Sequence, residues 1–275
     1  MTVPWSIAIK ELRDALRNRW LLAISVLFAV LAVGIAWFGA AASGTVGFTN
    51  VPATMASLST LATLLIPLIA LMLAYDAIVG EDEAGTLLLL LSYPLRREQL
   101  LLGKFFGHGL ILALATVAGF GAALLVILVG AEDVPAALLV GAFARFAVSS
   151  MMLGWVFLAM AYVLSCRVRE KSTAAGLALA VWFFFVLVFD WLLLALLVLS
   201  EGRFSPESLP WVLLCSPTDL YRLINLSGFD AGAEMTGVLA LGRELPVPVW
   251  GLWGALGLWM LVPLTLALVL FRRRI

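Results

Sequence analysis

Six long apolar segments constrain the fold of this chain more than any other feature of its sequence. They cover residues 20–42, 58–80, 104–130, 136–165, 172–200 and 249–271. A helix needs about 20 apolar residues to cross the hydrocarbon core of a bilayer, and every segment is long enough. Of the 275 residues, 64% are hydrophobic and 12% are charged, whereas a soluble domain has about 25% charged residues. The sequence therefore predicts an all-α membrane protein with six transmembrane helices.

Residues 1–19 form a separate unit ahead of the first apolar segment. Its large apolar side chains recur at helical spacing, at Trp5, Ile9, Leu12 and Leu16, and its cations lie on the other side. This pattern is typical of an amphipathic helix that lies flat in the membrane interface. A cleaved signal peptide is the alternative, but segment 20–42 is longer than the 7–15-residue core of such a peptide. We expect an interfacial helix at 1–19 followed by a six-span domain at 20–275.

The distribution of cations predicts the orientation of the chain. Lysine and arginine precede the first span, occupy the second and fourth connections, and end the chain at Arg272, Arg273 and Arg274. Cytoplasmic loops carry an excess of such residues. Both termini and the loop 75–104 are therefore expected in the cytoplasm of a multi-pass protein of the bacterial inner membrane. The loop 201–248 then faces outward, either as a lid on the bundle or as a docking platform for a periplasmic protein.

The loop 75–104 holds the densest run of acids, followed by five leucines that are too few to cross a bilayer. We expect one short helix over residues 81–93, with its acids in the first turn, where the helix dipole favours negative charge. Gly85 inside it indicates a bend or a close backbone approach. This helix either lies among lipid headgroups or docks on a soluble partner. The candidate site residues are Glu81, Asp82, Glu83, Gly85, Thr86, Leu87, Leu88, Leu89, Leu90, Leu91, Pro94, Arg96 and Arg97.

The same loop resembles a known family. The run Glu83–Ala84–Gly85–Thr86, the leucines, Ser92–Tyr93–Pro94 with two arginines, and then Gly103–Lys104 are similar to a stretch of type-2 ABC exporter permeases. The resemblance implies that this loop is the coupling helix that fits a cleft on an ATPase. It also implies a homodimer of permeases with a dimer of cytoplasmic ABC ATPases. ATP and Mg would be bound by the ATPase, and this chain would hold no cofactor of its own.

Other stretches, including KELRDALRNRW near the start and GKFFGHGLILALA, resemble the permeases that serve maturation of nitrous oxide reductase, an enzyme of denitrification. This resemblance implies copper delivery to the periplasmic reductase and a periplasmic partner of the NosD type. A sulfur species or a hydrophobic molecule is an alternative cargo. A passive membrane anchor for partner proteins is the alternative from another functional class.

The sequence carries no pattern of catalytic residues. Gly103–Lys104 lacks the upstream glycine and the following Ser or Thr of a phosphate-binding loop. No paired carboxylates, Ser-His-Asp set or Cys-His set share a plausible face. The methionines lack Cys or His at ligand spacing, so no metal site is predicted. The formal net charge of zero gives no indication of nucleic-acid binding. We therefore expect a non-catalytic membrane subunit.

Two charged residues lie deep in apolar segments and are candidates for a special role. Counted from the outer ends of their segments, Arg145 and Asp190 both lie roughly 14 Å below the outer surface. An isolated charge at this depth is costly, and an opposite charge offsets much of that cost. We expect Arg145 and Asp190 to form an intramembrane ion pair; a place on a cargo path is the alternative.

Overall fold

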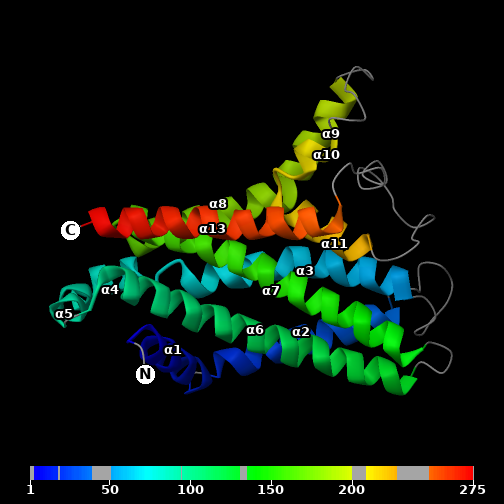
Figure 1. Cartoon of the computed structure of the whole chain (residues 1–275), viewed down its shortest axis with the longest axis horizontal. Helices are drawn as coiled ribbons and strands as arrows, with labels where there is room; N and C mark the ends of the chain where they lie inside the picture. Colours follow the sequence, from blue (N-terminus) through cyan, green and yellow to red (C-terminus); the bar gives the residue numbers. More distant parts are fainter. Residues whose placement is uncertain are drawn as a thin grey trace.

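A computed structural model of the chain describes residues 3–17, 19–38, 51–93, 95–130, 135–199, 209–227 and 248–274 (Figure 1). All regular secondary structure in these ranges is helical. In chain order the elements are α1 (Val3–Arg17), α2 (Trp20–Phe38), α3 (Val51–Ala74), α4 (Val79–Glu83), α5 (Thr86–Ser92), α6 (Arg97–Gly130), α7 (Ala136–Arg167), α8 (Lys171–Phe183), the π-helix η2 (Phe184–Val188), α9 (Phe189–Leu199), α10 (Leu209–Leu213), α11 (Pro217–Leu226) and α13 (Val249–Arg273). The site candidate Pro94 lies outside the described residues.

The described residues contain five or six candidate membrane-spanning helices, where the sequence predicts six. Within the described residues, five helices are long and apolar enough to cross a bilayer. A sixth span arises if α1 and α2, which meet at a bend of 68°, are counted together. Arg19 between them has φ 56, a left-handed backbone conformation that turns the chain. The prediction of an all-α membrane protein is confirmed.

Figure 1 shows the long helices side by side, with the two ends of the chain at one end of the bundle. α1, α4 and α5 lie at this same end, which we call the terminus-bearing end. α7 occupies the centre and packs against α3, α6 and α13. Aromatic side chains fill much of the core; Phe120 and Phe146, for example, have ring centroids 4.7 Å apart in an edge-to-face contact. The terminus-bearing end thus gathers segments from the whole chain.

Small residues allow α1 to pack closely against α6. A Cβ at Gly107 would lie 2.8 Å from the Cβ of Glu11, so only glycine permits this approach. The facing residues of α1 are also small: Ala8 is 1% exposed and Ala15 is 7% exposed. The bulky Trp5 and Leu16 are about half exposed. The close approach of α1 to α6 at Gly107 therefore depends on small residues that the spacing of the large apolar side chains does not indicate.

The fifth span is interrupted by a π-helix. Residues 184–188 form η2, and beyond it α9 diverges from the bundle, with α10 close to it in the view (Figure 1). A π turn disturbs the regular helical hydrogen-bond ladder. The carbonyl of Phe185 accepts a hydrogen bond from the Thr218 hydroxyl at 3.0 Å. The π segment is thus joined to α11, which lies at the other end of the bundle from the termini.

Candidate functional site

The loop between α3 and α6 contains two short helices rather than one. Gly85 has φ 69, and this left-handed residue ends α4 and precedes α5. The acids therefore belong to α4, which continues the second span: residues Thr54–Glu83 form one candidate membrane helix. This corrects the expectation of a single helix over 81–93, although Glu81 and Asp82 do lie in the first turn of α4. The backbone conformation of Gly85 separates the acidic run from the leucines.

Each of the three consecutive acids of α4 binds a different part of the bundle. Glu81 Oε1 pairs with Lys104 Nζ of α6 at 2.9 Å. Asp82 pairs with Arg274, just beyond α13, at 2.8 Å. Glu83 Oε1 accepts a hydrogen bond at 2.7 Å from the backbone N–H of Lys171, the first residue of α8. The acids therefore hold the α4–α5 segment against three separate spans.

Lys104 is the centre of this network and is itself buried, with 7% of its side chain exposed. Its ammonium lies 3.6 Å from Glu11 Oε1 of α1 as well as beside Glu81. The second oxygen of Glu11 lies 3.7 Å from His108 Nε2. The other ring nitrogen of His108 hydrogen-bonds Tyr162 of α7 at 2.9 Å. A chain of polar contacts thus runs from α4 through α6 to α1 and to α7.

Thr86 completes the connection between the two short helices. Its hydroxyl donates to the carbonyl of Glu81 at 3.1 Å and also contacts the Glu81 carboxylate. The first residue of α5 is therefore tied to the acid that binds Lys104. This contact therefore joins α5 to the Lys104 network.

The five leucines do not share one environment. Leu87 is 1% exposed, and Leu90 and Leu91 are partly buried against the core. Leu88 and Leu89 are each 65% exposed, and Tyr93 is 66% exposed. We call Leu88, Leu89 and Tyr93 the outer face of α5. These three large apolar side chains, two on α5 and one directly after its last residue, form a surface suited to contact with another protein.

The two arginines after α5 differ in their surroundings. Arg96 is exposed, and its backbone N–H donates to the Gln99 side chain at 3.0 Å, a contact that caps the start of α6. Arg97 donates from Nη1 to the carbonyl of Arg272 at 3.0 Å. Glu98 and Arg272 form a further ion pair. The start of α6 is therefore joined to the end of α13.

Asp190 has a different partner from the one expected. Its carboxylate lies 2.8 Å from Arg222 Nη1 of α11, and the same guanidinium lies 3.2 Å from Asp219 Oδ1. Among the described residues no salt bridge joins Asp190 to Arg145, which is half-buried on α7. The expected pairing of Arg145 with Asp190 is thus corrected. Two neighbouring spans need not stay adjacent along their whole length, and the fifth span leaves the bundle after η2.

α11 packs into the bundle between α3, α7 and α13. Ser216 caps its start by accepting a hydrogen bond from the Asp219 N–H at 3.3 Å, and Pro217 follows. Tyr221 hydrogen-bonds Ser150 of α7 at 3.0 Å, and Asn225 donates to Ser149 at 2.9 Å. These contacts close the end of the bundle opposite the termini.

The surroundings of Asp219, including the neighbouring carboxylate of Asp190, change the pKa of Asp219. Burial and the nearby charge of Asp190 raise the pKa of Asp219 to about 6, although Arg222 and the Ser216 hydrogen bond oppose this shift. Asp219 Oδ2 is buried and has no hydrogen-bond partner among the described residues. The sequence identified Asp190 as a special residue but not Asp219 or Arg222. Asp219 and Arg222 are three positions apart, a spacing that places them on the same side of a helix, and they follow the capping residue Ser216. This pattern could have indicated their ion pair.

No group of three or more His, Cys, Asp or Glu side chains that could hold a metal ion occurs in the part of the chain that the structure describes. Cys166 is buried and Cys215 is exposed, and both are free thiols. Within the described ranges, the methionines that could bind a soft metal ion therefore have no cluster of His, Cys, Asp or Glu ligands to support them.

Comparisons with known proteins identify the family. A model of the ABC-2 family transporter proteins matches residues 5–274. The chain is 68% identical over 275 residues to a "Probable ABC transporter permease protein NosY" of Stutzerimonas stutzeri, and the match covers all of both chains. It is 69% identical over 274 residues to the protein of the same name of Pseudomonas aeruginosa, covering 100% of this chain and 99% of that one. Such a permease is the non-catalytic membrane component and works with an ATPase. The chain belongs to the ABC-2 family of transporter permeases.

Proposed function

We propose that this chain is a NosY-type permease of the bacterial inner membrane that couples ATP hydrolysis in the cytoplasm to copper delivery for periplasmic nitrous oxide reductase. Its identity of 68–69% to two permeases named NosY, over essentially their full length, carries this proposal. ATP and Mg are bound by the partner ATPase. The terminus-bearing end faces the cytoplasm, in keeping with the cations that follow α13 and flank α1.

In this proposal the outer face of α5 docks on the ATPase. Burial of Leu88, Leu89 and Tyr93 in a cleft would remove their exposed apolar area from water. The three acids of α4 then transmit the movement, because each already binds a different span. Motion of the ATPase would reach α6 through Lys104, α13 through Arg274 and α8 through the Lys171 backbone.

A second copy of the chain is proposed to pack against the fifth span. In the most apolar stretch of Lys171–Leu199 only 11% of the residues are buried within this chain, against 61% for the spans that contain α3 and α7. Trp191, Leu192 and Leu194 of α9 are exposed large apolar residues. On the opposite side of the membrane, the end that α11 closes would meet a periplasmic protein of the NosD type.

The copper content of nitrous oxide reductase tests this function directly. In cells that lack the permease, we expect purified reductase to hold at least about tenfold less copper, a loss that the wild-type chain restores. Full copper loading without the permease would contradict the proposal. A reductase with full copper but without its sulfur would instead identify a sulfur species as the cargo.

A substitution at Lys104 tests whether the permease is coupled to the ATPase or is a passive membrane anchor. Lys104→Met leaves Glu81 and Glu11 without their shared partner, so α5 loses its link to α1 and α6. Coupling free energies of about 1–3 kcal/mol correspond to roughly 5–150-fold effects, and we expect copper loading to fall about tenfold. The ATPase should still copurify, since the outer face of α5 is unchanged. Arg13→Met is the matched control, because Arg13 also removes a cation from this end of the molecule and is exposed on α1. Unchanged loading in Lys104→Met would favour an anchor.

A further inference from the structure

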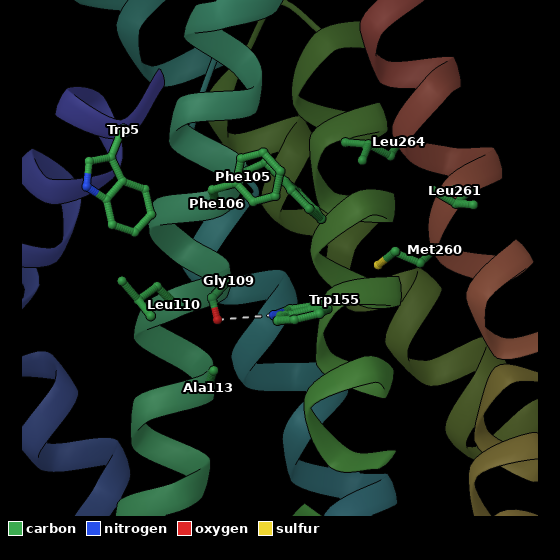
Figure 2. A pocket seen from close by; sticks show the side chains of 10 residues that line it. All are labelled: Trp5, Phe105, Phe106, Gly109, Leu110, Ala113, Trp155, Met260, Leu261 and Leu264. Atoms are coloured by element: carbon green, nitrogen blue, oxygen red, sulfur yellow. Dashed lines mark hydrogen bonds between the residues drawn. The ribbon is translucent and has the colours of Figure 1, made fainter. Parts of the chain in front are cut away.

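An apolar pocket of about 320 Å³ lies between α1, α6, α7 and α13 (Figure 2). Its walls are aromatic and aliphatic, with Trp5 from α1, Phe106 from α6, Trp155 from α7 and Leu264 from α13. The volume lies near the lower limit of small-molecule sites, which span about 300–1,000 Å³. The pocket shares no residue with the coupling segment or with the Asp190–Arg222–Asp219 cluster.

Gly109 shapes the inner wall of this pocket. A Cβ at this position would lie 3.0 Å from Trp155 Nε1, so glycine leaves room for the indole to lie against α6. The indole N–H donates to the Gly109 carbonyl at 3.1 Å, as the dashed line in Figure 2 shows. This hydrogen bond satisfies the indole N–H of Trp155, which is therefore not available to an occupant of the pocket. An occupant would meet hydrocarbon and aromatic surface there, which suits an apolar chain and disfavours a polar molecule.

The depth of the pocket matches one leaflet of a bilayer. Phe105 follows Lys104, which lies in the polar network at the terminus-bearing end, and the lining extends to Ala113. Eight residues of helix correspond to about 12 Å. On α13, Leu264 lies eight residues before Arg272, again about 12 Å. Half of the hydrocarbon core measures about 15 Å, so the pocket spans the leaflet nearer the termini.

The rim of the pocket is exposed on the outside of the bundle. Trp5, Phe106 and Leu261 are each about half exposed. Trp5 belongs to the amphipathic helix α1, and tryptophan favours the level of the lipid headgroups. An apolar molecule can therefore enter sideways from the membrane.

We propose that this pocket binds one acyl chain of a phospholipid from the leaflet at the terminus-bearing end. The chain lies along α6 with its end toward Ala113, and its headgroup remains near Trp5. Bound in this way, the lipid fills the space between α1 and α13, which both contact α6. It holds α1 in the position where Glu11 meets Lys104. This bound lipid is distinct from the cargo of the transporter.

Filling the inner end of the pocket tests this assignment. The permease–ATPase complex is extracted in mild detergent, and retained phospholipids are counted by native mass spectrometry. We expect one retained phospholipid per permease in the wild type. Retention should fall at least tenfold in Ala113→Phe, since the added ring occupies the site. Val117→Phe, one turn further along α6, is the matched control and should retain the lipid, because Val117 is exposed outside the pocket.

A second measurement remains decisive if Ala113→Phe does not assemble. The complex is loaded with phosphatidylethanolamine that carries brominated chains, and loosely bound lipid is removed with detergent. Bromine should then quench Trp155, so that the quenched fraction of the total fluorescence falls in Trp155→Phe. Equal lipid retention in all three chains, a wild-type complex without retained lipid, or quenching that is independent of Trp155 would overturn the proposal. Cross-linking of Met260→Cys between two copies would also overturn it, since protein would then cover the pocket.

Discussion

Replacing Leu89 with aspartate should abolish copurification of the ATPase while the permease remains folded in the membrane. Leu89 is 65% exposed in the free chain, so the new carboxylate remains in water there and costs little. In the proposed complex the same carboxylate is buried without a partner, which costs several kcal/mol. Because each 1.4 kcal/mol is about a factor of ten in affinity, binding should weaken at least about a hundredfold. Affinity purification of the tagged permease, followed by quantitation of the ATPase, measures the loss.

Ser172→Asp provides the matched control for Leu89→Asp. Ser172 is exposed at the start of α8, so it adds the same charge at the same end of the molecule but away from α5. An acid in the first turn of a helix is also electrostatically favourable. This variant should retain the ATPase at wild-type stoichiometry. If Leu89→Asp also retains it and supports full copper loading, α5 is not the docking helix.

Replacing Arg222 with methionine should destabilise the permease strongly and in a pH-dependent way. The substitution removes the shared cation from Asp219, whose side chain is 3% exposed, and from Asp190. Removal of one partner from a buried ion pair costs about 3–5 kcal/mol. Thermal unfolding of the purified complex at pH 8 should therefore begin several degrees lower than in the wild type.

The sign of the pH effect follows from the raised pKa of Asp219. A carboxyl group with a pKa of about 6 in the folded protein holds its proton more tightly there than in the unfolded chain, where its pKa is about 3.9. Its contribution to stability is therefore favourable below the unfolded pKa and is lost as pH rises through about 6. Without Arg222 the pKa of Asp219 rises further, since Arg222 lowers it. Arg222→Met should thus recover much of its stability between pH 8 and pH 5.5.

Arg145→Met is the control for this experiment, because Arg145 is the other deep cation and forms no ion pair with Asp190. We expect it to cost much less than Arg222→Met at pH 8. Adding Asp219→Asn to Arg222→Met should restore part of the lost stability, since one uncompensated charge disappears. A larger loss from Arg145→Met, or a loss from Arg222→Met that is the same at every pH, would contradict the assigned pairing.

Local sequence determined the helices and their order. Runs of 20 or more apolar residues have no stable conformation in a bilayer other than one that satisfies every backbone group, so the spans could be predicted from composition. Ser216 and Pro217 marked the start of α11 for the same local reason, since a cap depends on adjacent residues. Gly85 indicated a bend. The sequence did not show that this bend separates two helices, with the acids in α4 and the leucines in α5.

Only the tertiary structure decided which residues meet across the bundle. The partners of Glu81, Asp82 and Glu83 on other spans lie between 23 and 192 positions away in sequence, and no periodicity relates them. Asp190 faces Arg222 rather than Arg145 because η2 redirects the fifth span, and a π turn has no composition that distinguishes it from the flanking apolar helix. The helices could be predicted from the sequence because their hydrogen bonds are local. The charge network could not, because its contacts depend on how the helices pack.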